Sequence, residues 1–192
     1  MYNWYDQGKR LYYGRFGFVA DVLLFALITY GFHLVFRYFA IEFMSIPFVH
    51  HLAQFLADLV FKVSLWINRY VLQMSITTEA DNHMWFSNCG YIKVNLGCSG
   101  LKQFYQVLVL FLLFPGPWKH KVWFIPLGFL VMFLTNIFRI VSLSVVLLWK
   151  PDCWEFFHNW ILRPFFYFIL FCLWLWWVEV FRRKGKASVS TY

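Results

Sequence analysis

Residues 122–149 read VWFIPLGFLVMFLTNIFRIVSLSVVLLW, a continuous apolar run in which Arg139 is the only charged residue. A helix rises about 1.5 Å per residue and the hydrocarbon layer is about 30 Å thick, so roughly 20 apolar residues are enough to cross it. The run exceeds that length. It therefore predicts a transmembrane helix with an arginine in its second half.

The composition of the whole chain is that of a membrane protein. Of its 192 residues, 61% are hydrophobic and 24% are aromatic, whereas only 14% are charged. Soluble domains are about 45–50% apolar and about 25% charged, which excludes an ordinary globular domain. The net charge of +8 lies largely beside apolar runs, where positive residues set membrane orientation, so we expect no nucleic-acid partner. Four widely spaced cysteines contain no C-x-x-C pair, and we expect no metal and no cofactor.

Four stretches meet the length requirement for a span. The predicted spans are residues 16–39, 99–114, 122–149 and 160–181, with a cytoplasmic N-terminus over 1–15, an outer loop over 77–98 and a cytoplasmic tail over 182–192. The second of these is marginal because Pro115 and Pro117 end it early. We treat the chain as a single membrane domain.

Residues 46–76 are apolar enough to suggest a fifth span, but polar side chains recur along them about every four residues. The polar positions are His50, Gln54, Asp58, Lys62, Arg69 and Gln73. They form one stripe on a helix, and a charge in the middle of a span costs at least about 2.5 kcal/mol. We therefore predict an amphipathic helix in the membrane interface.

The distribution of basic residues favours four spans with both termini in the cytoplasm. The inner segments would then carry Lys9, Arg10, Arg15, Lys119, Lys121, Arg182, Arg183, Lys184 and Lys186. The outer segments would hold Lys62, Arg69, Lys93 and Lys150 over a greater length. This agrees with the positive-inside rule. The predicted fold is an all-α integral membrane protein with about four transmembrane helices and an outer-face interfacial helix.

This topology brings three reactive side chains to the outer membrane level. Cys98 begins the second predicted span, Arg139 lies near the outer end of the third, and His158 ends the short loop before the fourth. Asn136 lies one turn from Arg139 on the same face. Each residue also has a structural explanation, because cysteines are often buried, arginines snorkel to headgroups and histidines occur in interfaces.

The three side chains together indicate acyl transfer. A cysteine at a helix start, with Lys102 one turn along and Arg139 opposite, has the positive surroundings that favour a thiolate. His158 would carry the proton. Arg139 stays protonated, so it would hold a substrate carbonyl or a developing oxyanion, with Asn136 supporting it.

The order of these motifs resembles the exosortase/archaeosortase family. Gly97-Cys98-Ser99-Gly100 opens a span, Asn136-Ile137-Phe138-Arg139-Ile140 lies in the next, and His158 precedes the last; the resemblance covers roughly residues 95–181. It implies a cysteine transpeptidase with Cys98, Arg139 and His158 as its catalytic triad. It also implies a partner, the C-terminal sorting signal of an exported protein, made of a short motif, a transmembrane helix and a basic tail. Many members carry a glycine shortly after the histidine; here that region is Ile161, Leu162, Arg163 and Pro164.

Two other interpretations stay open. The same tetrapeptide fits G-x-S-G, which would make Ser99 the nucleophile of a rhomboid-like intramembrane serine protease. Alternatively, the chain is a scaffold or a small transporter subunit in which Arg139 binds a lipid phosphate. The substrate motif, the acceptor (water, lipid or glycan) and the oligomeric state are not determined by the sequence.

Two further pairings are considered. His33 and Arg37, near the outer end of the first predicted span, would either pair with Asp58 or Glu42 or snorkel to the headgroups. Cys89 and Cys153 both lie on the oxidising side in this topology and would form a disulfide, leaving Cys98 free.

Overall fold

The computed structural model describes residues 17–79, 82–86 and 90–189. The predicted cytoplasmic N-terminus and Cys89 lie outside these residues, whereas Cys153 is a free thiol. The helices are α2 (Gly17–Ser45), α3 (Pro47–Trp66), α4 (Leu101–Leu113), α5 (Trp118–Trp149), α6 (Trp154–Phe156) and α7 (Arg163–Val189). The strands are β1 (Ile76–Glu79), β2 (His83–Phe86) and β3 (Gly90–Lys93).

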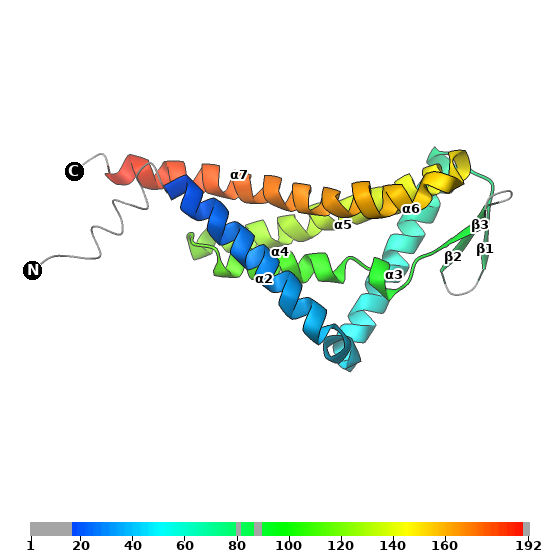
Figure 1. Cartoon of the computed structure of the whole chain (residues 1–192), viewed down its shortest axis with the longest axis horizontal. Helices are drawn as coiled ribbons and strands as arrows, with labels where there is room; N and C mark the ends of the chain where they lie inside the picture. The colour runs from blue at the N-terminus through cyan, green and yellow to red at the C-terminus, as the bar shows by residue number, and fades with distance from the viewer. Residues whose placement is uncertain (1–16, 80–81, 87–89, 190–192) are drawn as a thin grey trace, which may run out of the picture.

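Helices α2, α4, α5 and α7 run side by side as an elongated bundle (Figure 1). Their shared core is strongly aromatic, and its largest fully buried side chains are Phe111, Phe124, Trp174 and Trp177. Away from this core, α2 is largely exposed along its apolar surface, as expected of a helix that faces lipid. The bundle therefore confirms the predicted all-α membrane fold.

Four segments are long and apolar enough to cross a membrane: Gly17–Ser45, Pro47–Val71, Trp118–Trp149 and Pro151–Val180. The number agrees with the prediction, but the set differs from it. Helix α4, which we predicted as a span over residues 99–114, has 13 residues and covers only about 20 Å at helical rise. The segment that we predicted as interfacial is, by length and composition alone, among the four.

The packing of α3 nonetheless supports an interfacial position, which stays a prediction. Its buried face contacts the start of α4 through Leu101 and the second half of α5 through Ile140, so α3 touches one end of the bundle. Phe48 and Phe55 lie on a second face and are 74% and 63% exposed. A third face carries the polar stripe that begins at His50. A helix between protein, lipid and water needs these three faces.

Within the segment that we predicted as an outer loop, Ile76–Glu79, His83–Phe86 and Gly90–Lys93 form a three-stranded antiparallel sheet in the order β1-β2-β3. Met84 faces Ile92, and Phe86 pairs with Ile76 and Gly90. The side chains of β2 alternate between buried and half-buried, as a strand with one packed face requires. The buried ones cover α3 and α5, so the sheet closes the end of the bundle where α3 lies.

Two predicted boundaries also change. Helix α2 continues to Ser45 rather than to residue 39, and one residue, Ile46, separates it from α3. The fourth predicted span begins earlier than residue 160, since helical turns run from Trp154 through a π-helical segment, Phe157–Leu162, into α7. Helix α7 then reaches Val189, so most of the predicted tail is helical.

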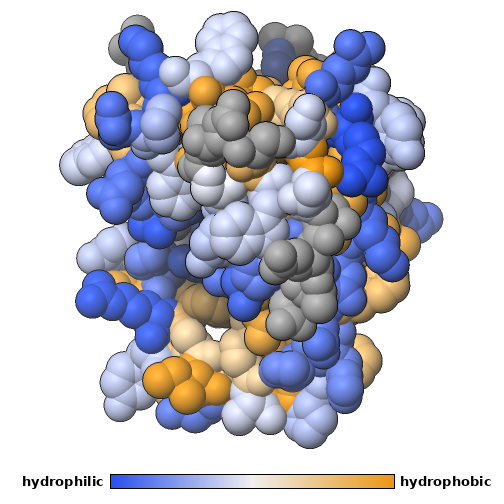
Figure 2. All heavy atoms as spheres, turned by 90° about the vertical axis from the view of Figure 1, so that its right-hand side faces the viewer, coloured by the Kyte–Doolittle hydropathy of each residue, from blue (hydrophilic) through white to orange (hydrophobic). Residues whose placement is uncertain are grey.

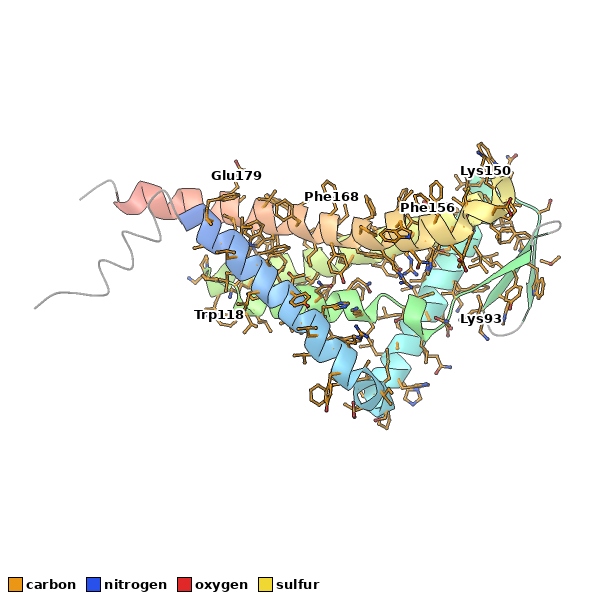
Figure 3. All side chains as sticks on the ribbon, viewed as in Figure 1. Lys93, Trp118, Lys150, Phe156, Phe168 and Glu179 are labelled. Carbon is orange, nitrogen blue, oxygen red and sulfur yellow. The ribbon has the colours of Figure 1, made fainter. Side chains whose placement is uncertain are left out.

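The two ends of the bundle are formed by different segments of the chain. The start of α2, the α4–α5 connection and the end of α7 lie at one end, near Trp118 and Glu179 (Figure 3). The sheet, Lys93 and Lys150 lie at the other. Viewed from this second end, hydrophilic residues cover most of the surface, with smaller apolar patches between them (Figure 2). Because the start of α2 and the end of α7 lie at the same end of the bundle, the structure is consistent with a chain that crosses the membrane an even number of times.

Candidate active site

Cys98 is the last residue of a short 3₁₀ turn, Leu96–Cys98, that precedes α4. Its backbone N–H donates to the Asn95 carbonyl over 2.8 Å. Gly100 then adopts φ +81°, a left-handed conformation that favours glycine, before α4 begins at Leu101. The chain therefore turns sharply between the cysteine and the helix, and the thiol lies beside the helix start rather than within α4.

Asn136 of α5 fixes this turn from across the bundle. Its Nδ2 donates to the carbonyl oxygen of Cys98 over 2.7 Å, and the side chain is buried. A Cβ at Gly100 would lie 3.1 Å from the same Nδ2. Glycine at position 100 thus serves two purposes, the positive φ and the close approach of the amide. The structure gives Asn136 a direct role in placing the cysteine backbone.

Arg139 lies one turn further along α5 and contacts both of the other predicted catalytic residues. Its Nη2 lies 3.0 Å from His158 Nε2, and its guanidinium is close enough to the Cys98 side chain to interact with it electrostatically. The arginine is only 9% exposed and lies over the ring of Phe166, 5.8 Å from its centroid. Burial among apolar groups makes an unpaired charge expensive, so these contacts are a reason for the arginine to stay in place.

His158 lies in the π-helical segment that leads into α7, not in a loop as we predicted. Its imidazole stacks on Trp154, with ring centroids 5.0 Å apart and an angle of 16° between the planes. The histidine follows the tryptophan by four positions in the chain (i, i+4), so helical winding places them on one face. A π-turn is common where a helix presents a functional side chain.

The two other predicted site residues point elsewhere. Ser99 is 2% exposed, and its Oγ accepts from the backbone N–H of Leu101 over 3.3 Å, which satisfies one donor at the start of α4. Lys102 has its Nζ 3.3 Å from His33 Nδ1 of α2. We predicted that Lys102 would act on the thiol from one turn along; its amine is instead engaged by α2.

Sequence reasoning missed several neighbours of the site. Arg163 is close enough to interact electrostatically with Lys102, Arg139 and His158, although its position was noted only as a departure from the family pattern. The predicted partners of His33 were wrong, since it contacts Lys102 and Tyr167 while Asp58 accepts from Asn82. The spacing of Trp154 and His158 was a usable signal, but it required knowing that the segment is helical.

Taken together, the site holds a thiol, a guanidinium and an imidazole on three segments, with an amide that anchors the thiol's backbone. Within the described ranges, no three His, Cys, Asp or Glu side chains converge as the ligands of a metal ion would. A nucleophile, a fixed positive charge and a proton carrier are the groups that acyl transfer through a covalent intermediate requires.

A comparison with protein families identifies the chain. The model described as "Transmembrane exosortase" matches residues 13–177, which is most of the chain and includes the whole site. The chain therefore belongs to the transmembrane exosortase family. No curated protein and no solved structure matches it.

Proposed function

We propose that this chain is a cysteine transpeptidase that cleaves C-terminal sorting signals from exported, membrane-anchored proteins. The reaction would take place at the outer face of the cytoplasmic membrane, with both termini of the enzyme in the cytoplasm. Its catalytic residues would be Cys98, Arg139 and His158. Membership of the transmembrane exosortase family supports a membrane-embedded role of this kind.

The observation that carries the proposal is the double contact of Arg139. One guanidinium lies 3.0 Å from His158 Nε2 and close enough to the Cys98 side chain to interact with it electrostatically, although the three residues come from different segments of the chain. Structural explanations for the residues taken singly do not account for this convergence. A snorkelling arginine would point to headgroups, whereas Arg139 is buried among the other two.

The chemistry follows from the three groups. The thiol proton passes to the imidazole, and the Cys98 thiolate attacks the scissile carbonyl carbon, whose oxygen gains charge that Arg139 stabilises. The carbon–nitrogen bond then breaks, a thioester forms, and His158 gives the proton to the leaving amine. An acceptor with a hydroxyl, an amine or water next loses its proton to His158, attacks the thioester and releases the cysteine.

The placement of Ser99 argues against the rhomboid-like alternative. Its hydroxyl already accepts a backbone hydrogen bond at the helix start, and 2% exposure leaves a substrate little access to it. No contact with His158 is found for it among the described residues. The cysteine is half-buried and next to the guanidinium, so it is the better nucleophile.

Separate Cys98→Ala and Ser99→Ala variants test the assignment. Each would be co-expressed with a tagged protein, encoded nearby, that carries a terminal apolar helix and a basic tail. Processing, followed by the size of the tagged protein, should be abolished in Cys98→Ala and retained in Ser99→Ala. Processing that survives loss of the thiol but not of the hydroxyl would establish the serine protease instead, and indifference to both would favour the scaffold.

A further inference from the structure

A polar cavity of about 300 Å³ lies beside Arg139 and is lined by residues of α2, α4, α5 and α7 and by Gly97, the residue before Cys98. Three of its lining residues are the cations Lys102, Arg139 and Arg163, and His33 completes the basic wall. No Asp or Glu among the described residues lines it. Three positive groups without a carboxylate partner are costly in a membrane protein unless an anion balances them.

Two of the lining residues also carry a buried donor that has no hydrogen-bond partner in the described part of the chain. Gln106 is 6% exposed and lines the cavity, and its Nε2 has no hydrogen-bond partner. The Nε of Arg139 is likewise buried and unpaired. Lys102 uses one of its three N–H donors on His33, which leaves two for a ligand. Lys102 and Arg163 offer only donors to the cavity, so the ligand that suits it is an acceptor with several oxygens, such as a phosphate.

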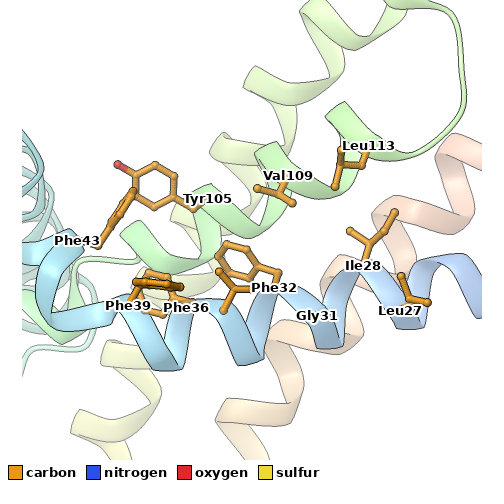
Figure 4. Close-up of a pocket in the computed structure, with 11 residues that line it drawn as sticks. Leu27, Ile28, Gly31, Phe32, Phe36, Phe39, Phe43, Tyr105, Val109 and Leu113 are labelled. Atoms are coloured by element: carbon orange, nitrogen blue, oxygen red, sulfur yellow. The ribbon is translucent and has the colours of Figure 1, made fainter.

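An apolar groove of about 450 Å³ adjoins this cavity. It lies between α2 and α4, and Figure 4 shows Gly31 and Phe36 on one wall and Tyr105 and Val109 on the other. Lys102 connects the two spaces: it lines the cavity, and its Nζ lies 5.4 Å from the centroid of the Phe36 ring, which lines the groove. A polar compartment thus adjoins an apolar one at a single lysine.

We propose that the cavity and the groove together bind one phospholipid, with its phosphate on Lys102, Arg163 and Gln106 and a hydrocarbon chain in the groove. Basic pockets between transmembrane helices are a known way to hold lipid headgroups. The polar cavity suits the headgroup of a phospholipid, and the apolar groove suits its hydrocarbon chain. The bound phosphate would lie next to Arg139 and so beside the candidate active site.

The basic cavity beside the groove favours a phospholipid over the apolar helix of a protein partner, because an apolar helix brings no anion to Lys102 and Arg163. The groove itself has a volume of about 450 Å³ and is lined by apolar side chains of α2 and α4. A narrow, flexible chain can follow it from Phe43 to Leu113.

Binding to the purified protein in a non-ionic detergent tests the proposal without reference to peptidase activity. The probes are dioctanoyl phosphatidylglycerol, dioctanoylglycerol and inorganic phosphate, with affinities measured by native mass spectrometry or thermophoresis. The phosphatidylglycerol should bind most tightly. The double variant Lys102→Gln/Arg163→Gln should lower the affinity for phosphatidylglycerol about tenfold or more, since charge-assisted hydrogen bonds are lost. Lys62→Gln, an exposed cation on α3, is the matched control and should change nothing.

Gly31→Leu is the complementary variant. A Cβ at Gly31 meets nothing within 4 Å, so a leucine fills the groove without a clash in the helix. It should lower the affinity for phosphatidylglycerol and leave the affinity for inorganic phosphate unchanged. The phosphate site would be overturned if phosphatidylglycerol bound no more tightly than dioctanoylglycerol, or if its affinity were unchanged in the double variant. Inorganic phosphate that binds as tightly as the lipid, or a lipid affinity unaffected by Gly31→Leu, would overturn the lipid as occupant.

Discussion

The Nη2 of Arg139 lies 3.0 Å from the Nε2 of His158, and this contact determines the state of the imidazole. A guanidinium can only donate, so Nε2 accepts and the ring proton is on Nδ1. The same guanidinium contacts the Cys98 side chain, so the thiol and the imidazole are connected through the arginine. Proton transfer from the thiol therefore requires His158 to exchange its arginine contact for the sulfur, as catalytic hydrogen bonds often tighten only when substrate is bound.

Arg139→Lys should be poorly active although it keeps the charge. An ammonium is a point charge on a flexible stem and cannot reproduce the planar fork that reaches both partners. Loss of one charge-assisted hydrogen bond to a buried partner costs about 1.5–3 kcal/mol, which is about a 10- to 150-fold loss of rate. The measurement is the rate of processing of the tagged substrate. Arg37→Lys, at an exposed position on α2, is the control; equal rates in wild type and Arg139→Lys would contradict a role for the fork.

Gly100→Ala should damage the site without touching a catalytic residue. The left-handed backbone costs an alanine roughly 1–2 kcal/mol, and its Cβ would press on the Asn136 amide, 3.1 Å away. The bond from Asn136 to the Cys98 carbonyl would then lengthen and move the thiol. Processing should fall by about tenfold or more, at 1.4 kcal/mol per tenfold.

Gly97→Ala is the matched control for that variant. Its Cβ would meet the Asn95 Oδ1, at 3.2 Å, and Asn95 is an exposed side chain that can move. We expect little change in processing. Equal losses in the two variants would show that the segment tolerates no side chain at all, and that Asn136 is not the reason.

The sequence located the candidate site because its residues are chemically unusual in their setting. An arginine in an apolar run and a cysteine between glycines are conspicuous, and span lengths place them at one membrane level. The partners of Lys102 and Ser99 were not predictable, since they depend on how α2 crosses α4 and on the turn at Gly100. Those features arise from tertiary packing, which leaves no local pattern in the sequence.

The fold was predictable in proportion to the strength of each apolar pattern. Long apolar runs such as that of α5 predicted their helices with boundaries only a few residues in error, because the length of an apolar run is the dominant signal for a membrane span. The sheet was missed because its strands have only four residues each. The alternation of buried and exposed side chains that would predict strands rests on few residues, such as Met84, Phe86 and Ile92. Such short strands are stable only against α3 and α5, a contact that no local window contains.

Accessibility labelling tests the proposed orientation. Single cysteines would replace Lys93, Lys150 or Lys119 in a chain otherwise free of cysteine; all three positions are exposed. A membrane-impermeant maleimide should label the first two in intact spheroplasts and the third only after permeabilisation, because the first two lie at the sheet end (Figure 3). Labelling of position 119 from outside would invert the topology and remove the active site from the outer face.

Ser144→Ala should destabilise the junction of α3 and α5. The Ser144 hydroxyl accepts from Asn68 Nδ2 over 2.8 Å, and both side chains are fully buried. Its removal leaves a buried amide donor with only the distant sulfur of Met84, at 3.9 Å. An unsatisfied buried donor costs about 1–3 kcal/mol, so the thermal midpoint in detergent should fall. Ser142→Ala, half-buried on the same helix, should be within about 0.5 kcal/mol of wild type.

Two glycine variants should change stability in opposite directions, because their helices meet different surroundings. In Gly128→Ala, the new Cβ would lie 2.8 Å from Val107 Cγ1, and Val107 is fully buried between α4 and α5. Overpacking of this kind costs about 1–3 kcal/mol, and the β-branched valine has little freedom to turn away. Gly31→Ala meets nothing within 4 Å and should gain about 0.5–1 kcal/mol of helix propensity. Thermal unfolding in one detergent measures both, and a lower midpoint for both would mean that α2 packs more closely on α4 than its open groove implies.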